Sequence, residues 1–220
     1  MRGYYSDKLS AERLRRCYDI APPRVKQYLD AEIQHVMDKI QSTDFVLELG
    51  CGYGRVLEKL CQKAKTTLGI DTSKASLEYA KKILPGSNCH LLQMNAIALG
   101  FKDRSFDIVV CIQNGISSFK VDNRDLFRES IRVTKPNGIV LFSSYSDKFW
   151  EYRLEWFEIQ AREGLIGEIN LKATNDGVII CKDGFKAFTV SPNEFVMLTS
   201  KLGVASKIYE IDNSSVFCEI

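Results

Sequence analysis

The stretch FVLELGCGYGRVLEKL, from Phe45 to Leu60, combines an apolar run, a glycine-rich turn and a helical pattern. The apolar run is typical of a strand that is covered on both faces. Three glycines follow it at every second position: Gly50, Gly52 and Gly54. Glycine lets a backbone approach a ligand closely, and the first N–H groups of a following helix are free to bind it. The stretch therefore predicts a ligand site at the end of a buried strand.

Strand-like and helix-like segments alternate through the middle of the chain. We expect strands at 45–49, 66–71, 89–95, 106–113 and 139–146, and helices at 55–64, 73–84 and 123–134. Such alternation is typical of a parallel sheet with helices on both faces. The sequence therefore predicts an α/β fold.

The two ends of the chain depart from this alternation. Residues 9–40 have helical patterns that are interrupted at Pro22–Pro23. Beyond residue 147 we expect an aromatic-rich helical stretch, two short β-like runs at 169–173 and 177–190, a capped helix at 191–203 and a closing antiparallel pair within 204–220. We therefore expect one domain of residues 1–220, divided into an N-terminal helical part (1–42), a core (43–146), an insert (147–190) and a C-terminal part (191–220).

Composition excludes several classes of protein. The formal net charge is +2, and the absence of a basic stripe argues against tight non-specific nucleic-acid binding. No apolar stretch approaches the length of a membrane span, and the polar N-terminus does not resemble a signal peptide. The seven cysteines have neither CxxC nor Cys/His spacing, which predicts no metal site and reduced, buried thiols in a cytoplasmic protein. They stand at positions 17, 51, 61, 89, 111, 181 and 218.

Two classes of cofactor compete for the glycine turn. A dinucleotide fingerprint, G-x-G-x-x-G, requires glycine at position 55, which is Arg55. An acid, Glu48, precedes the turn, and a second acid, Asp71, ends the next strand. The arrangement E-L-G-C-G-Y-G resembles the first motif of the class I S-adenosylmethionine-dependent methyltransferases. The resemblance extends from about residue 45 to 146, because GIDTS, NAIALGFKDRSFDIVV and VTKPNGIVLF are similar to later motifs of that family in the same order.

This resemblance implies a Rossmann-like, seven-stranded, mostly parallel sheet with helices on both faces, an N-terminal helical lid and a small β insert. It implies S-adenosyl-L-methionine as cofactor and S-adenosyl-L-homocysteine as product. Asp71 would accept hydrogen bonds from the ribose hydroxyls, Glu48 would attract the ammonium group, and the Asn95 oxygen would face the adenine amino group, where the family usually has an acid. The expected cofactor-binding residues are Glu48, Gly50, Cys51, Gly52, Gly54, Asp71, Thr72, Asn95, Ala96, Ile97 and Gln113.

The methyl acceptor is less constrained. Methyltransferases that act on amino groups of nucleic acids typically carry N/D-P-P-aromatic after the fourth strand, whereas this chain has Asn114–Gly115–Ile116. A small-molecule acceptor is therefore expected. Positioning alone supplies much of the rate in direct methyl transfer, so the lack of a catalytic triad is no objection. The substrate-side candidates are Tyr18, Tyr28, Asn114, Ser117 and Tyr145.

Several alternatives stay open at this point. The chain could methylate RNA or protein, or bind S-adenosylmethionine without catalysis. An NAD-dependent oxidoreductase is a further alternative. The aromatic residues of 147–190 suit either a substrate cover or the interface of a homodimer, since Trp and Tyr favour both. The identity of the acceptor is beyond the sequence.

Overall fold

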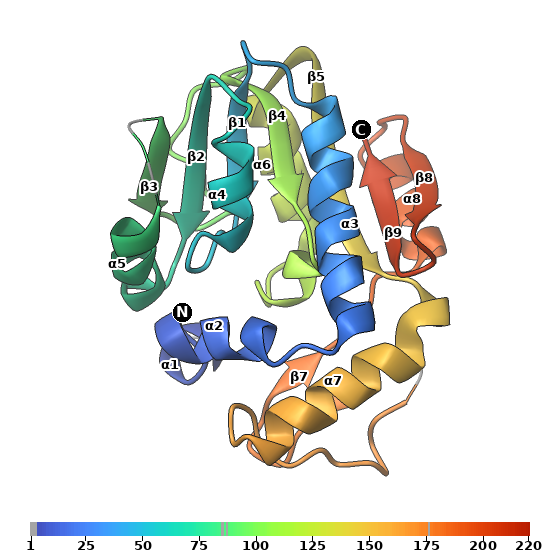
Figure 1. The fold of residues 1–220 in the computed structure, drawn as a ribbon. Helices are drawn as coiled ribbons and strands as arrows, with labels where there is room; N and C mark the ends of the chain where they lie inside the picture. The colour runs from blue at the N-terminus through green and yellow to red at the C-terminus, as the bar shows by residue number, and fades with distance from the viewer. Residues whose placement is uncertain (1–3, 85, 87, 176) are drawn as a thin grey trace.

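A seven-stranded sheet forms the centre of the computed structural model, which describes residues 4–84, 86, 88–175 and 177–220 (Figure 1). The strand order is β3-β2-β1-β4-β5-β9-β8. The first five of these strands are parallel, and β9 and β8 continue the sheet antiparallel. In this order the strands span Cys89–Gln93, Thr66–Asp71, Phe45–Leu49, Phe106–Cys111, Thr134–Tyr145, Ser215–Glu219 and Lys207–Ile211. The predicted fold class is confirmed.

Both faces of the sheet are buried because the central strands are apolar throughout. Neighbouring residues point to opposite faces, so Val46 and Leu47 of β1 enter two different apolar clusters. One cluster lies under α3 (Pro23–Lys39) and α4 (Arg55–Leu60), which stand in front of the sheet in Figure 1. The other lies under α6 (Asn123–Val133) and α8 (Pro192–Lys201). The helix α5 (Lys74–Ile83) packs beside β3 and β2.

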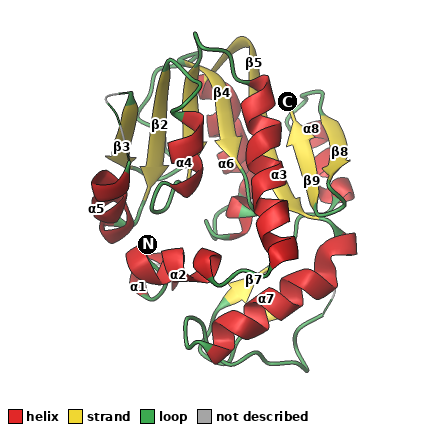
Figure 2. Ribbon diagram, viewed as in Figure 1, coloured by secondary structure: helices red, strands yellow, loops and turns green. Residues whose placement is uncertain are grey.

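A third apolar cluster lies away from the sheet. It joins the N-terminal helices α1 (Tyr4–Asp7) and α2 (Ala11–Asp19) to α7 (Trp150–Arg162), which follows the short 3₁₀ turn η2 (Asp147–Phe149). The indole N–H of Trp156 donates to the carbonyl of Cys17 at 2.8 Å and so ties α7 to α2. Figure 2 shows α1 and α2 between the sheet and α7. None of the helices within the described ranges is long and apolar enough to cross a membrane.

The insert has less strand than the sequence suggests. Its two strands, β6 (Ile179–Ile180) and β7 (Lys186–Ala187), are two residues each. The run at 169–173 is not a strand: Ile169 makes only an isolated bridge, and the following residues turn. The N–H of Asn170 still donates to the carbonyl of Ile180 at 2.8 Å, and further along the Thr174 hydroxyl accepts the N–H of Ile180 at 3.1 Å, a side-chain bond of the kind that competes with a strand ladder.

Helix boundaries follow their caps. Ser191 and Glu194 form a reciprocal capping box at the start of α8, as the sequence predicted. The helix expected at 55–64 ends at Leu60 and continues as turns. The fifth strand begins at Thr134, earlier than expected, and its register against β4 shifts between Phe106 and Ile108. The short helix α1 was not predicted.

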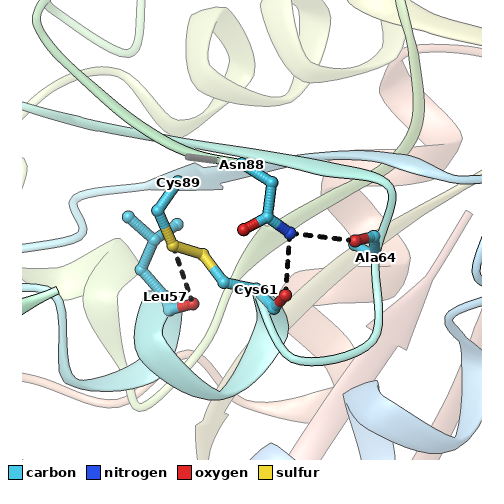
Figure 3. The surroundings of a disulfide bond; sticks show 5 residues. All are labelled: Leu57, Cys61, Ala64, Asn88 and Cys89. Atoms are coloured by element: carbon cyan, nitrogen blue, oxygen red, sulfur yellow. Dashed lines mark hydrogen bonds between the residues drawn. A yellow bond between two sulfur atoms is a disulfide. The ribbon is translucent and has the colours of Figure 1, made fainter. Parts of the chain in front are cut away.

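One pair of cysteines is not reduced, contrary to the sequence-based expectation. Cys61, just after α4, forms a disulfide with Cys89, the first residue of β3 (Figure 3). Their Cα atoms are 5.8 Å apart although 28 positions separate them in the chain, so spacing alone gave no signal. The Asn88 amide donates to the carbonyls of Cys61 and Ala64 at the same junction. Five other cysteines are free and buried: 17, 51, 111, 181 and 218.

The disulfide generates a prediction about stability. Replacing both partners (Cys61→Ser with Cys89→Ser) should lower the free energy of unfolding by about 3–4 kcal/mol, because a cross-link over a loop of this length restricts the unfolded chain. Urea denaturation without reductant measures it. Dithiothreitol should lower the midpoint of the parent protein and leave that of the double variant unchanged. A parent protein that is insensitive to reductant would contradict the prediction.

Candidate functional site

The glycine turn after β1 is held against the end of β2. The N–H groups of Gly50 and Cys51 both donate to the carbonyl of Ile70, at 2.8 and 2.9 Å. Gly50 and Gly52 have φ angles of +73° and +53°, in the left-handed region that favours glycine. A Cβ on Gly50 would also lie 3.0 Å from the ring of Phe119. The turn is thereby closed on one side by β2 and open to the carboxyl edge of the sheet.

Asp71, the last residue of β2, joins the turn to the next helix. Its carboxylate accepts the N–H of Gly52 at 2.9 Å and the N–H of Ser73 at 2.7 Å. Ser73 is the N-cap of α5. Burial raises the pKa of Asp71, and these backbone hydrogen bonds act in the opposite direction. The carboxylate is therefore fixed in place between two backbone segments.

A cavity of about 260 Å³ opens at this edge of the sheet. The arrowheads of β2, β3 and β4 in Figure 1 point toward α2, on the side where the cavity lies. Most of the sequence-predicted residues line it together: Tyr18, Glu48, Gly50, Cys51, Gly52, Asp71, Thr72, Asn95, Ala96, Ile97, Gln113, Asn114, Ser117 and Tyr145.

Two predicted residues do not line this cavity. Gly54 is instead the N-cap of α4, with a φ of +88°, and serves the turn into that helix. Tyr28 is fully buried, with its ring centroid 5.2 Å from that of Tyr145 and 5.0 Å from that of Phe149. Its contribution is to packing behind the cavity wall.

Glu48 brings a buried carboxyl to the cavity. Burial raises its pKa to about 8, although the positive charge of Arg55 works in the other direction. Its Oε2 atom is buried and has no hydrogen-bond partner among the described residues. A buried carboxyl oxygen without a partner is costly, and a donor on a bound molecule would satisfy it.

Arg55 lines the same cavity, although it was not among the predicted site residues. Its guanidinium lies 4.3 Å from the ring centroid of Tyr18 and donates to the side-chain oxygen of Gln113. It is the only Lys or Arg among the described residues that line the cavity. Its position immediately after the glycines was the signal available in the sequence.

The end of β4 is bent away from strand geometry. Gln113 and Asn114 both have a φ of +57°. The N–H of Gln113 donates to Glu32 Oε2 at 2.6 Å and to the Ser143 hydroxyl at 2.8 Å, which holds the bend. Burial raises the pKa of Glu32 to about 7, and the hydrogen bonds that its carboxylate accepts from the Ser143 hydroxyl and the Gln113 N–H oppose the rise. Glu32 was also missed, although it is a lone acid on the apolar face of α3 beside Leu29 and Val36.

The Asn114 amide is fully engaged within the protein. Its Nδ2 donates to the Ser117 hydroxyl at 3.0 Å and to the carbonyl of Phe188 at 2.9 Å. Its Oδ1 accepts the hydroxyl of Ser144 at 2.8 Å. Asn114 therefore borders the cavity as a tie between segments, and its amide hydrogens are not available to a substrate.

Aromatic side chains close the cavity opposite the sheet. Tyr18 comes from α2, and Trp156 and Phe157 come from α7. Tyr18 was predicted as a substrate-side residue, whereas the aromatic residues of 147–190 were expected either to cover a substrate or to form an interface; Trp156 and Phe157 line the cavity. Within the described part of the chain, no group of three or more His, Cys, Asp or Glu side chains is arranged to hold a metal ion.

Comparison with known proteins agrees with this geometry. Residues 46–138 match the family model described as a methyltransferase domain. A ubiquinone biosynthesis O-methyltransferase of Pseudomonas fluorescens is 32% identical over 130 residues, which are 58% of this chain and 52% of the relative. A malonyl-[acyl-carrier protein] O-methyltransferase of Marinomonas is 28% identical over 185 residues, which are 81% of this chain and 62% of the relative. The chain thus spans about half to three fifths of the length of these curated relatives.

The fold is shared with solved structures. The N-methyltransferase NodS from Bradyrhizobium japonicum, solved in complex with S-adenosyl-L-homocysteine, superposes with a TM-score of 0.59 at 16% identity and covers 97% of each chain. The matched family model agrees with the glycine turn, with the acids at the ends of β1 and β2 and with the order of the strands in the sheet. Residues 46–138 thus match a methyltransferase domain, and the chain has the fold of solved S-adenosylmethionine-dependent methyltransferases, whose cofactor is S-adenosyl-L-methionine.

Proposed function

We propose that the chain transfers the methyl group of S-adenosylmethionine to a small-molecule nucleophile. The observation that carries the proposal is the cavity at the carboxyl edge of the sheet. It places the glycine turn and two carboxyls, Glu48 and Asp71, opposite an aromatic wall. S-adenosylmethionine supplies an electrophilic methyl group on a positively charged sulfur, which aromatic faces and a water-poor surrounding favour.

The residues present suit that cofactor. The buried, unpartnered Oε2 of Glu48 is an acceptor for an ammonium group, and the Arg55 guanidinium beside it suits a carboxylate. Asp71 has its carboxylate fixed by Gly52 and Ser73 and retains lone pairs for ribose hydroxyls. We propose that Thr72, Asn95, Ala96, Ile97 and Gln113, which border the same cavity, complete the cofactor contacts.

A small acceptor is supported by what encloses the cavity. The N-terminal helices and α7 cover it, and Arg55 is the one cationic side chain among its described lining residues. A polynucleotide substrate would normally require several. We propose that residues 1–42 act as a lid, and that Tyr18 and Tyr145 border the acceptor. The O-methyltransferases among the relatives favour a small acceptor as well.

We further propose a cytoplasmic location, which five buried, free thiols support. The Cys61–Cys89 disulfide argues in the other direction, since disulfides are rare in reducing compartments. Mass spectrometry of the protein after rapid alkylation of intact cells decides between the two. Both thiols alkylated would support the proposal, and a persistent disulfide would contradict it.

The proposed activity is tested with S-adenosylmethionine labelled on its methyl group. Incubation with a cell extract that is separated into metabolites and macromolecules should place the label in the metabolite fraction. A heat-inactivated protein is the control for transfer by the extract itself. Label in RNA or protein would instead establish the macromolecular alternative. Cofactor binding without any transfer, with the extract supplying every metabolite class, would indicate a non-catalytic binding module.

The raised pKa of Glu48 predicts a pH-dependent affinity for the cofactor. The carboxyl is protonated below about pH 8 and must lose its proton to pair with an ammonium group. The dissociation constant should therefore fall as pH rises toward about 8, by up to about tenfold per pH unit. Isothermal titration calorimetry should detect release of a proton near pH 7. Glu48→Gln should lose this pH dependence, and a variant that retained it would exclude Glu48 as its source.

Asp71 provides a second test of cofactor binding. Asp71→Asn should weaken the affinity for S-adenosylmethionine by about 1–3 kcal/mol, because a charged acceptor for the ribose hydroxyls is lost. Asp107→Asn is the matched control: Asp107 also accepts a backbone N–H, from Phe45 at 2.9 Å, but lies at the start of β4. The control should bind the cofactor normally. Equal affinities for both variants would exclude the ribose assignment.

A further inference from the structure

Arg153 of α7 is a buried cation. Its side chain has a relative exposure of 0% and lies among aromatic rings. The guanidinium carbon is 4.4 Å from the ring centroid of Tyr145 and 5.6 Å from that of Phe157. Burial lowers the pKa of Arg153, but a guanidinium keeps its proton in proteins. The positive charge is therefore present within an apolar cluster.

No acid neutralises this charge among the residues that the structure describes. The groups whose charges act on Arg153 are the tyrosines 145, 28 and 5. The faces of nearby rings compensate a buried cation in part, through cation–π attraction. A buried charge without a counter-ion remains costly, and such a cost is typical of a site that is completed by a ligand.

The donors of Arg153 are satisfied on one side only. Its Nη1 donates to the carbonyl of Gly177 at 2.7 Å. Its Nε and Nη2 are buried and have no hydrogen-bond partner within residues 4–84, 86, 88–175 and 177–220. These two N–H groups share one edge of the planar guanidinium and point in parallel. That edge is the fork that binds the two oxygens of a carboxylate, as two hydrogen bonds at once.

The rings around the guanidinium border the cavity, although Arg153 is not itself among the described residues that line it. Tyr145 and Phe157, the rings that flank the guanidinium, also line the cavity, and so does Tyr5. The acids of the cavity lining, Glu48 and Asp71, belong to the strand ends β1 and β2. Arg153 is instead on α7, whose apolar side chains belong to the cluster that joins this helix to α1 and α2. The cavity thus has its carboxyl groups at the glycine turn and a lone cation behind its aromatic wall.

We propose that Arg153 is the anchor for a carboxylate on the methyl acceptor, so that the substrate of this enzyme is a small carboxylic acid. The carboxylate binds Nε and Nη2 of Arg153 once the Tyr145 ring gives it access, and the rest of the acceptor extends past Tyr145 toward the glycine turn. This inference rests on the proposed function, because it assigns the acceptor of that same cavity.

The experiment measures binding of simple acids and their neutral amides to the protein saturated with S-adenosylhomocysteine. The probes are two matched pairs, benzoate with benzamide and hexanoate with hexanamide. At least one acid should bind about tenfold or more tightly than its amide, as expected for a charge-assisted, paired hydrogen bond. Arg153→Met should abolish this preference. Arg153→Lys, which keeps the charge but loses the fork, should reduce it several-fold.

Arg24 supplies the matched control. Its guanidinium also lies over aromatic rings, 5.0 Å from that of Phe149, but it is paired with Asp212 at 2.6 Å. Arg24→Met should keep the preference for the acid and lose stability with its ion pair. Arg153→Met should unfold at the same or a higher denaturant concentration than the parent protein, because it removes an uncompensated buried charge. A purely structural arginine would give the opposite result.

Each outcome separates this inference from the proposed function. Acids and amides that bind equally to the parent protein, or an acid preference that survives Arg153→Met, would overturn the carboxylate site while cofactor binding stands. Acid binding that S-adenosylhomocysteine displaces would overturn it too, because the carboxylate would then belong to the cofactor. If S-adenosylmethionine fails to bind in a separate titration, the proposed function fails, whatever the acids show.

Discussion

The hydrogen bonds between the glycine turn and the end of β2 position the whole candidate site. The carbonyl of Ile70 receives two N–H groups of the turn, and the Asp71 carboxylate receives a third. With the turn fixed in this way, α4 starts at a set place and Arg55 is directed across the cavity toward Gln113. The rest of the site depends on that arrangement, because the N–H of Gln113 in turn donates to Glu32 and Ser143.

The apolar clusters stabilise the fold, whereas the buried polar groups serve the candidate site. Two clusters cover the two faces of the sheet. Their apolar side chains stabilise the fold by being removed from water and require no specific polar partner. Glu32, Glu48 and Arg153 are buried at the carboxyl edge or beyond it, and each has a polar atom without a hydrogen-bond partner in the part of the chain that the structure describes. Such groups reduce stability, so their presence around one cavity marks the region where the structure serves a ligand.

The fold was predictable because its signals are local. A buried strand, its glycine turn and the alternation of strands and helices depend on neighbouring residues, and the seven-stranded, mostly parallel sheet followed from the family resemblance. Most residues of the glycine turn line one cavity, as predicted, because their signal is local in the sequence too. The disulfide was not predictable, because it depends on how α4 and β3 meet across 28 positions of sequence.

Glu32 and Arg153 were not predicted as site residues, for a different reason. A single charge within an apolar helical face was detectable, but whether it is paired is a property of the packed structure. The strand predicted at 169–173 is absent for a similar reason: its composition favours a strand, but whether a partner strand pairs with it depends on the packed structure, where Thr174 bonds Ile180 through its side chain. Tyr28 and Gly54 have roles in packing and turning that their residue types alone do not distinguish from contact with a ligand.

The three hydrogen bonds of the Asn114 side chain have a thermodynamic consequence. They connect the end of β4, which carries the neighbouring Gln113, with Ser144 of β5 and Phe188 of the insert. An event that shifts the insert therefore acts on the strand end beside the cofactor loop. Linkage is reciprocal: if an occupied acceptor site changes the affinity for the cofactor by some factor, the cofactor changes the affinity for the acceptor by the same factor. One amide group would then couple the binding of the two substrates, whichever of them binds first.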